Sequence, residues 1–124
     1  MATREAAASV HERDGTAVIE LSGEIDRSAE TAVESAYAKA AGLATGPILL
    51  DFSATDYINS TGIALIVGVL AKARAEGREV KACGLSDHYR EIFEITRLAD
   101  FMTIFPDEAS ALANENSQQG GTNG

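Results

Sequence analysis

Apolar and polar residues alternate in two short runs near the start of the chain, separated by a turn signal. Residues 16–21 read TAVIEL, and residues 7–13 precede the dipeptide Asp14-Gly15. Alternation with a period of two is typical of half-buried strands, and Asp-Gly between two such runs favours a tight hairpin. We therefore predict an antiparallel hairpin at the edge of a sheet, with its second strand ending at Gly23.

Three later segments carry apolar residues at helical spacing. The first helix is expected after Ser28, a capping residue, and before Gly46-Pro47. The second is expected to begin at residues 59–62 (NSTG) and to end at Glu76-Gly77, and the third to follow the cap Ser86. The predicted buried stripes are Val33, Ala36, Tyr37, Ala40 and Ala41 in the first helix, Ile63, Ile66, Val67, Leu70 and Ala73 in the second, and Tyr89, Ile92, Phe93 and Thr96 in the third.

Continuous apolar runs lie between these helices. Residues 48–50 (Ile-Leu-Leu) are the pattern of a strand buried on both faces, with helices on both sides, and a polar loop is expected after them. Residues 79–85 and 101–105 predict two more strands, and Pro106 fits the first position of a last helix, with acidic residues in its first turn. The alternation predicts an α/β fold with a mixed, mostly parallel sheet of four to five strands and about four helices.

Length and composition agree with one folded domain. The chain has 124 residues, of which 45% are hydrophobic and 23% charged, as in ordinary globular domains. The last stretch, residues 114–124, is rich in Asn, Gln, Gly and Ser and has almost no apolar side chains. We predict a domain over residues 1–113 and a disordered tail over residues 114–124.

Charge, cysteine content and hydropathy limit the kinds of partner and the cellular compartment that we expect. The formal net charge of −9 opposes binding to nucleic acid, whose phosphates would be repelled. Cys83 is the only cysteine, which excludes an internal disulfide, and its apolar strand predicts a buried, unreactive thiol. The longest apolar run, residues 62–71, is shorter than the roughly 20 residues of a membrane span, and the N-terminus lacks a signal-peptide core. We expect a cytoplasmic protein without a membrane partner.

Residues that could support catalysis are sparse. His11 and His88 lie in different contexts, so nothing points to a Ser-His-Asp triad, and no phosphate-cradling glycine motif is present. Asp26, Asp51 and Asp56 could meet at the carboxyl edge of the sheet as a metal site, which is a minor alternative. We predict a protein that is not an enzyme, with no catalytic residue, cofactor or metal.

The NSTG turn of residues 59–62 is the strongest candidate for a functional site in the sequence. It places hydroxyl groups at a helix N-terminus, where free backbone N–H groups and the helix dipole favour negative charge, including a phosphate on serine. Asn and Ser are also common helix caps that need no function. Physical chemistry alone therefore favours an ordinary cap over a regulatory site.

A longer pattern surrounds this turn. LSGEID, the run LLDFSATDYINSTGIALIVGVLAKARAEGREVKACGL, and YREIFEITRL follow one another without large gaps. Together they closely resemble STAS domains of the anti-sigma factor antagonist type, over about residues 10–112. In that family a strand ends in Asp, a polar loop follows, and a serine that begins the next helix is phosphorylated. Ser60 takes that position here, and Thr61 is the competing acceptor.

The resemblance implies a partner-switching cycle that regulates transcription. The unphosphorylated protein would bind an anti-sigma factor that is a serine kinase of the histidine-kinase-like ATPase type, which frees a sigma factor. Phosphorylation would end binding, and a metal-dependent serine phosphatase would restore it. We expect a monomer or weak dimer, with a partner surface formed by Asp26, Asp56, Asn59, Ser60, Thr61 and Gly62.

One residue departs from the family pattern. Many members carry Asp before the phosphorylated serine, whereas this chain has Asn59, which keeps the capping oxygen and loses the charge. Two alternatives stay open within the same resemblance. The chain could be a scaffold or stress-sensing subunit of a larger assembly, or a STAS subunit of a lipid transporter.

Overall fold

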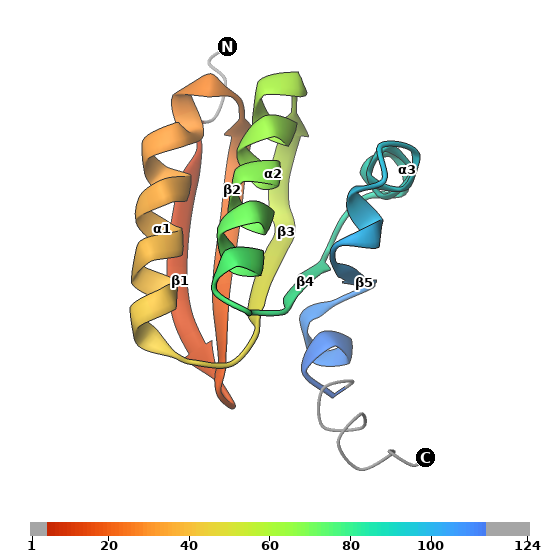
Figure 1. Ribbon diagram of the computed structural model, residues 1–124. Coiled ribbons are helices and arrows are strands. Elements are labelled where there is room, and N and C mark those ends of the chain that lie inside the picture. Colours follow the sequence, from red (N-terminus) through yellow and green to blue (C-terminus); the bar gives the residue numbers. More distant parts are fainter. Residues whose placement is uncertain (1–4, 114–124) are drawn as a thin grey trace.

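Five strands form one mixed sheet in the order β1-β2-β3-β4-β5. The computed structural model describes residues 5–113, and the expected tail lies outside them (Figure 1). The strands are β1 (Ala7–Arg13), β2 (Thr16–Ile25), β3 (Ile48–Ile58), β4 (Val80–Cys83) and β5 (Thr103–Phe105). β1 pairs with β2 in antiparallel register, and the other three pairs are parallel. The predicted edge hairpin and mixed, mostly parallel sheet are confirmed.

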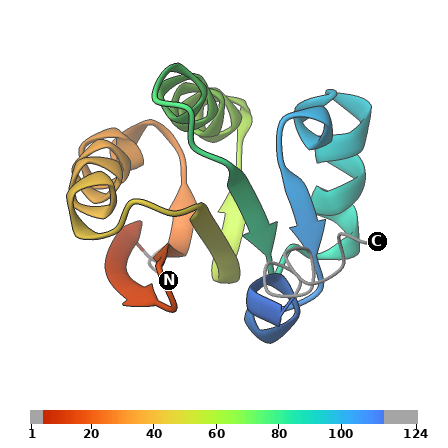
Figure 2. The ribbon, with the colours of Figure 1, turned by 60° about the horizontal axis from the view of Figure 1, so that its bottom comes forward.

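Helices cover both faces of this sheet. The longer ones are α1 (Glu30–Leu43), α2 (Ser60–Ala75) and α3 (Asp87–Ile95), and short 3-10 turns are η1 (Arg27–Ala29) and η2 (Leu98–Asp100). Residues 108–113 form a further helical segment. Figure 2 shows α1 and α2 on one side of the sheet and residues 108–113 on the other. The α/β class with four helices is confirmed.

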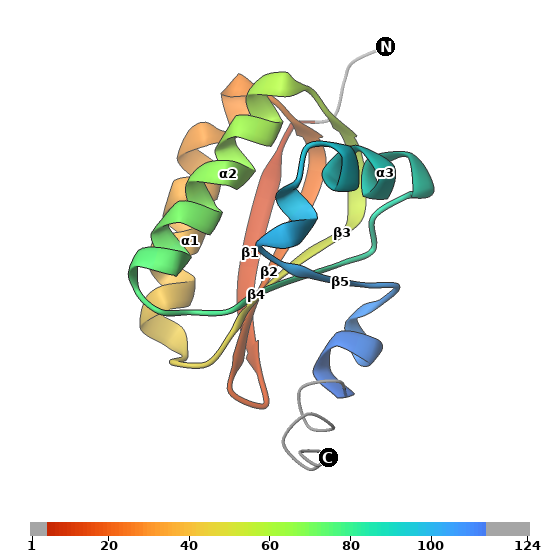
Figure 3. The same cartoon turned by 45° about the vertical axis from the view of Figure 1, so that its right-hand side comes forward.

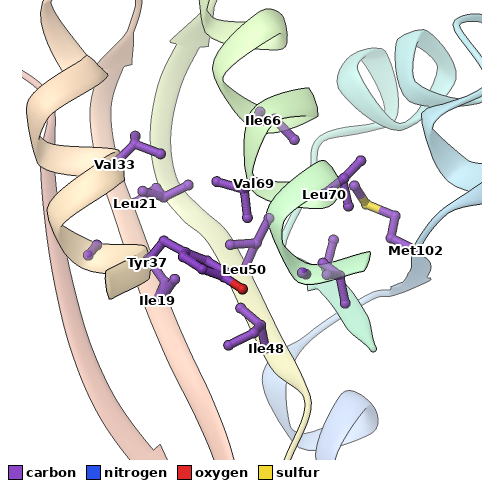
Figure 4. Close-up of a cluster of buried hydrophobic side chains, with 14 of the residues drawn as sticks. Ile19, Leu21, Val33, Tyr37, Ile48, Leu50, Ile66, Val69, Leu70 and Met102 are labelled. Atoms are coloured by element: carbon purple, nitrogen blue, oxygen red, sulfur yellow. The ribbon is translucent and has the colours of Figure 1, made fainter. Parts of the chain in front are cut away.

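Alternation along β2 divides the core into two parts. Ile19 and Leu21 point toward α1 and α2, where they meet Val33, Tyr37 and other side chains of the main core (Figure 4). Val18, which lies between such positions, points to the opposite face, where Leu49 of β3 and Ala111 of the 108–113 segment pack on it. Each buried Leu or Ile contributes about 1.5–3 kcal/mol relative to exposure. The run at residues 48–50 is apolar because both of its faces are covered.

The two central strands are longer than the sequence pattern predicted. β2 continues past Gly23 to Ile25, and β3 continues to Ile58 through the segment expected to be a loop. Parallel pairing persists to the last residues, Ile25 opposite Ile58, because both side chains are buried there. Two irregularities in register interrupt the alternation, and Gly23 adopts a positive φ of 80° beside one of them. Bulges of this kind hide a strand from a period-two pattern.

Helix α2 buries a slightly different stripe from the one predicted. Val69 is 5% exposed and belongs to the core, whereas Val67 is 44% exposed. Ile66, Leu70 and Ala73 are buried as predicted. The run around Val67 contains more apolar residues than one helix face can bury. Because α2 packs against both α1 and the sheet, the buried face includes Val69 and leaves Val67 exposed. In α3, Thr96 lies just past the last helical turn and is exposed.

Several boundaries also differ. The fourth and fifth strands are shorter than predicted, and η2 occupies the space before β5. The last helical segment begins at Glu108 and not at Pro106. The Asp107 carboxylate caps it by accepting a hydrogen bond from the backbone N–H of Ser110 at 2.8 Å. Ser28 does not cap α1: it lies inside η1 and donates to the carboxylate of Asp26, which caps that turn.

Candidate functional site

The N-terminus of α2 is a capped helix start with two exposed hydroxyl side chains. Asn59 is extended, with φ −97° and ψ −174°, and its Oδ1 accepts a hydrogen bond from the backbone N–H of Gly62 at 2.8 Å. The carbonyl of Asn59 accepts the first helical bond from Ile63 at 2.9 Å. Ser60 and Thr61 occupy the first two helical positions and are exposed. The cap predicted for this turn is therefore made by Asn59, which leaves both hydroxyl groups facing outward.

Gly62 seats this turn directly on the end of β2. It is buried, and a Cβ atom at this position would overlap with the carbonyl oxygen of Ile25. The same carbonyl accepts a hydrogen bond from the backbone N–H of Asn59 at 3.3 Å. Two backbone contacts to one atom leave no room for a larger residue at position 62. The orientation of Ser60 is thus fixed by the sheet as well as by the cap.

Asp26 follows Ile25 and so lies in the loop beside this turn. Its Oδ1 accepts hydrogen bonds from the hydroxyl of Ser28 at 2.6 Å and the backbone N–H of Ser28 at 2.9 Å. These bonds, the side-chain bond foremost, hold the pKa of Asp26 below its ordinary value because they stabilise the carboxylate. Asp26 therefore caps η1 and keeps a negative charge near the start of α2.

The end of β3 forms the third side of the surface. Asp56 is exposed. Thr55 and Tyr57 pair with consecutive residues of β2, so Asp56, which lies between them, is the unpaired residue of a bulge in the parallel pairing. Tyr57 is 49% exposed. Ile58, which leads into Asn59, donates its backbone N–H to the hydroxyl of Tyr89 on α3 at 3.0 Å. Asp56, one of the residues expected at this surface, therefore lies near a strand end that α3 helps to hold.

Tyr89 is a positioning residue that the sequence did not reveal. It was assigned to the apolar stripe of the third helix, and its ring is indeed partly buried against the core. Its hydroxyl, however, bonds a backbone group 31 residues earlier in the chain. The sequence did contain one signal: a tyrosine on the same predicted stripe as Ile92 and Phe93 needs a polar partner for its hydroxyl.

The helix end at Ser60 favours an added anion, although Asp26 holds a carboxylate in the neighbouring loop. The first turn of α2 contains no acidic residue, while Lys72 and Arg74 lie in its last turn and complement the negative end of the dipole. The partial positive charge at the N-terminus is therefore not offset by a carboxylate within the same turn. A phosphate on Ser60 would be placed beside the backbone N–H groups of that turn.

The minor alternative of a three-aspartate metal site is wrong. Asp51 is buried and accepts hydrogen bonds from the hydroxyl of Ser53 at 2.6 Å and its backbone N–H at 2.9 Å. Asp26 is engaged with Ser28 as described above. Among residues 5–113, the one set of three potential metal-ligating side chains that come close together contains none of Asp26, Asp51 and Asp56. Asp26 and Asp51 instead accept hydrogen bonds from residues two positions further along the chain.

Cys83 is buried, as predicted. It is fully inaccessible in β4, and burial, followed by the charge and hydrogen bond of Asp51, raises its pKa to about 12. A thiol with such a pKa is almost entirely protonated at neutral pH and is a poor nucleophile.

A hollow of about 750 Å³ lies at the opposite end of α2. It is lined by apolar side chains of α2, η2 and the start of β5, with Arg74 and Arg78 among them. Arg74 stands at 5.7 Å from the ring centroid of the exposed Phe101. Fourteen residues of helix separate Arg74 from Ser60, which is about 20 Å. The hollow is therefore distinct from the surface around Ser60. No helix in the described part of the chain is long and apolar enough to span a bilayer.

Comparison with known proteins places this geometry in a family. The sequence model of the STAS domain matches residues 7–111. BtrV of Bordetella bronchiseptica, assigned as an anti-sigma factor antagonist, is 30% identical over 93 residues, which cover 75% of this chain and 78% of that protein. The anti-sigma-B factor antagonist of Staphylococcus aureus is 29% identical over 86 residues, or 69% of this chain and 80% of that one. A crystal structure of an anti-sigma factor antagonist from Mycobacterium paratuberculosis superposes with a TM-score of 0.71 at 26% identity, covering 89% of this chain and 93% of the other.

Proposed function

The chain belongs to the STAS domain family, and we propose that it acts as an anti-sigma factor antagonist in the cytoplasm, by binding a protein partner and not by catalysis. The observation that carries this proposal is the exposed Ser60 at the start of α2, held by the Asn59 cap and by the contact of Gly62 with Ile25. The similarity to BtrV and to the mycobacterial antagonist supports the same role.

In this proposal the unphosphorylated protein binds an anti-sigma factor that is also a serine kinase, and a sigma factor is released. Docking requires a surface of fixed shape, because ordering a loose surface on binding costs free energy. The start of α2 meets this requirement, since its backbone is tied to β2 through Ile25 and its preceding strand is tied to α3 through Tyr89. Ser60 and Thr61 present the exposed part, while Asn59 and Gly62 set their orientation.

Phosphorylation of Ser60 then ends the complex. The phosphate adds about −1.5 to −2 charges and considerable bulk to a surface that must lose water on docking. It is tolerated in the free protein because it lies at the positive end of α2, whose first turn lacks an acidic residue. Asp26 and Asp56 make the surroundings already acidic, so a partner that accommodates a neutral hydroxyl would have to bury a concentrated negative charge. A serine phosphatase resets the switch by removing it.

The first experiment measures binding to the cognate anti-sigma kinase by calorimetry. Ser60→Asp is expected to weaken binding roughly tenfold or more, because a buried unpaired charge costs at least 1.4 kcal/mol. Ser60→Ala is expected to keep affinity within a factor of about three, since it removes only one hydroxyl. Ser35→Asp adds the same charge at an exposed position of α1 and serves as the matched control. Equal affinities for wild type, Ser60→Asp and Ser35→Asp would refute the proposal.

A second experiment identifies the acceptor. After incubation with the kinase and ATP, intact mass should show one added phosphate, and fragment mapping should place it on Ser60. Thr61→Ala is expected to retain phosphorylation and Ser60→Ala to lose it. Thr61 is also exposed, one position further into the helix, so phosphate found on Thr61 in the wild type would contradict the assignment.

A further inference from the structure

A second group of polar side chains lies at the other end of the molecule from Ser60. His11 of β1, Glu20 of β2 and Glu108 of the 108–113 segment bring their potential ligand atoms within 4.8 Å of one another. The pairing of β1 and β2 explains part of this arrangement. Ser9 lies opposite Glu20 and His11 opposite Val18, so Glu20 and His11 share the sheet face that the 108–113 segment covers. Figure 3 shows that segment on the far side of the sheet from α1 and α2.

Two atoms of this group are buried without a hydrogen bond. His11 Nε2 and Glu108 Oε2 are shielded from solvent, and neither has a hydrogen-bond partner among the described residues. They lie 3.9 Å apart, which is longer than the roughly 2.7–3.2 Å of a hydrogen bond. Buried polar atoms in folded proteins almost always have a partner, and a water or an ion bound between these two atoms would supply one. Both atoms belong to residue types that ligate metals.

The separation of His11 and Glu108 is close to that of two ligands of one metal ion, and a ligand atom of Glu20 lies within 4.8 Å of both. A tetrahedral ion such as Zn²⁺ binds nitrogen and oxygen at about 2.0–2.2 Å, which places its ligands about 3.4 Å apart. The observed 3.9 Å between His11 and Glu108 is about half an ångström more, and side-chain rotation supplies such a change. The hydroxyl of Ser9 donates to Glu20 Oε1 at 3.3 Å and so orients one carboxylate from outside the group.

Charge also favours a cation here. The two carboxylates lie within 4.8 Å of each other and repel. The Arg13 guanidinium is near, with Nη1 at 3.9 Å from the same Glu108 oxygen, and its mostly exposed side chain is free to turn toward solvent. An imidazole with two carboxylates suits Zn²⁺ and similar transition metals better than Mg²⁺ or Ca²⁺, which prefer oxygen ligands alone.

We propose that His11, Glu20 and Glu108 bind one divalent transition-metal cation of the Zn²⁺ type, which clamps the 108–113 segment to the β1–β2 hairpin. Three protein ligands leave one coordination position for water. The ion joins an edge of the sheet to the segment that covers the second core, where Lys81 Nζ already donates to the Ala111 carbonyl at 3.0 Å. The site is independent of the proposed partner switch, because it lies on another face and involves none of its residues.

The test is calorimetric titration of the untagged full chain with ZnCl₂, and with MgCl₂ in parallel. One Zn²⁺ per chain is expected, with no comparable binding of Mg²⁺ and a thermal midpoint that rises with Zn²⁺. His11→Gln and Glu108→Gln should each weaken Zn²⁺ binding roughly tenfold or more. Arg13→Gln should strengthen it, since it removes the competing cation. His88→Gln, which removes the other histidine of the chain from an exposed helical position, should leave binding unchanged.

Two outcomes would overturn the proposal. One is the absence of Zn²⁺ binding to the wild type. The other is wild-type affinity in both His11→Gln and Glu108→Gln, which would assign the ion to scattered surface carboxylates. Two ligand variants are used because their side chains lie on different elements, β1 and the 108–113 segment, so a folding defect in one, visible by circular dichroism, leaves the other informative.

Discussion

Helices α2 and α3 begin with the same type of cap and yet present different surfaces. Asn59 Oδ1 accepts from the N–H of Gly62 at 2.8 Å, and Ser86 Oγ accepts from the N–H of Tyr89 at 3.2 Å. The third residue of α2, Gly62, is buried against the Ile25 carbonyl, whereas α3 has the charged and exposed Asp87 as its first residue. A cap fixes where a helix begins. Close packing on the sheet and the lack of an acidic residue in the first turn distinguish the start of α2 and fit the proposed phosphate switch.

The largest expected effect comes from removing the seating of α2. Gly62→Ala should destabilise the protein by about 2 kcal/mol, because the overlap with the Ile25 carbonyl outweighs the gain of about 1 kcal/mol in helix propensity. Gly68→Ala is the matched control on the same helix, where an added Cβ meets nothing within 4 Å. It should stabilise by about 0.5–1 kcal/mol. Urea unfolding measures both values.

The signs of the two changes in unfolding free energy distinguish the contact of Gly62 with Ile25 from an effect of helix propensity alone. If Gly62→Ala stabilises the protein as Gly68→Ala does, the helix start is free to move and the contrast with α3 is lost. Destabilisation by Gly62→Ala, accompanied by weaker binding to the proposed anti-sigma partner, would tie the orientation of Ser60 to this contact.

The second prediction compares the caps themselves. Asn59→Ala should cost about 1–2 kcal/mol and Ser86→Ala about 0.5–1 kcal/mol. The reason for the difference is burial: Gly62 is buried, so water replaces the lost acceptor poorly, whereas the start of α3 is exposed. Thermal or urea unfolding of the two variants provides the measurement. A larger loss for Ser86→Ala would mean that α2 is not the better-defined helix start.

Local signals in the sequence predicted much of this contrast. Asn59 and Ser86 were identified as helix starts because capping residues precede runs with helical periodicity, and both caps form. The buried strand at residues 48–50 followed from its apolar run. The extension of β3 to Ile58 did not, because bulges and exposed polar residues removed the alternation, and only its pairing with β2 maintains the strand.

Local sequence signals of this kind could not predict contacts between distant segments. The seating of Gly62 on Ile25 and the bond from Ile58 to Tyr89 join residues more than thirty positions apart, and no local pattern encodes either pair. The same holds for the polar group at the other end of the molecule, where His11 and Glu108 come from opposite ends of the chain. The sequence could supply the residue types at these positions, whereas their partners followed only from the topology of the sheet.

The smallest effect expected concerns Asn59, the cap that precedes Ser60. Asn59→Asp keeps the capping oxygen and adds a negative charge at the positive end of α2, so at neutral pH it should stabilise by a few tenths of a kcal/mol. Two aspartates that cap turns in this protein, Asp26 and Asp107, already have pKa values lowered by the hydrogen bonds that they accept. An aspartate at position 59 should behave likewise, with its pKa lower in the folded than in the unfolded state.

The pH dependence of Asn59→Asp follows from that direction. A lowered pKa in the folded state contributes stability above the unfolded value of about 3.9, and this contribution disappears as pH falls through the folded value. The difference in unfolding free energy between Asn59→Asp and wild type should therefore be positive near neutral pH and vanish in acid, whereas Asn59→Ala should remain less stable than wild type throughout. A difference that does not change with pH would show that the charge at position 59 does not interact with the helix end. Asparagine and aspartate at position 59 would then differ in helix stability through something other than charge, and any effect of the charge on the proposed switch would have to arise in the complex with the partner.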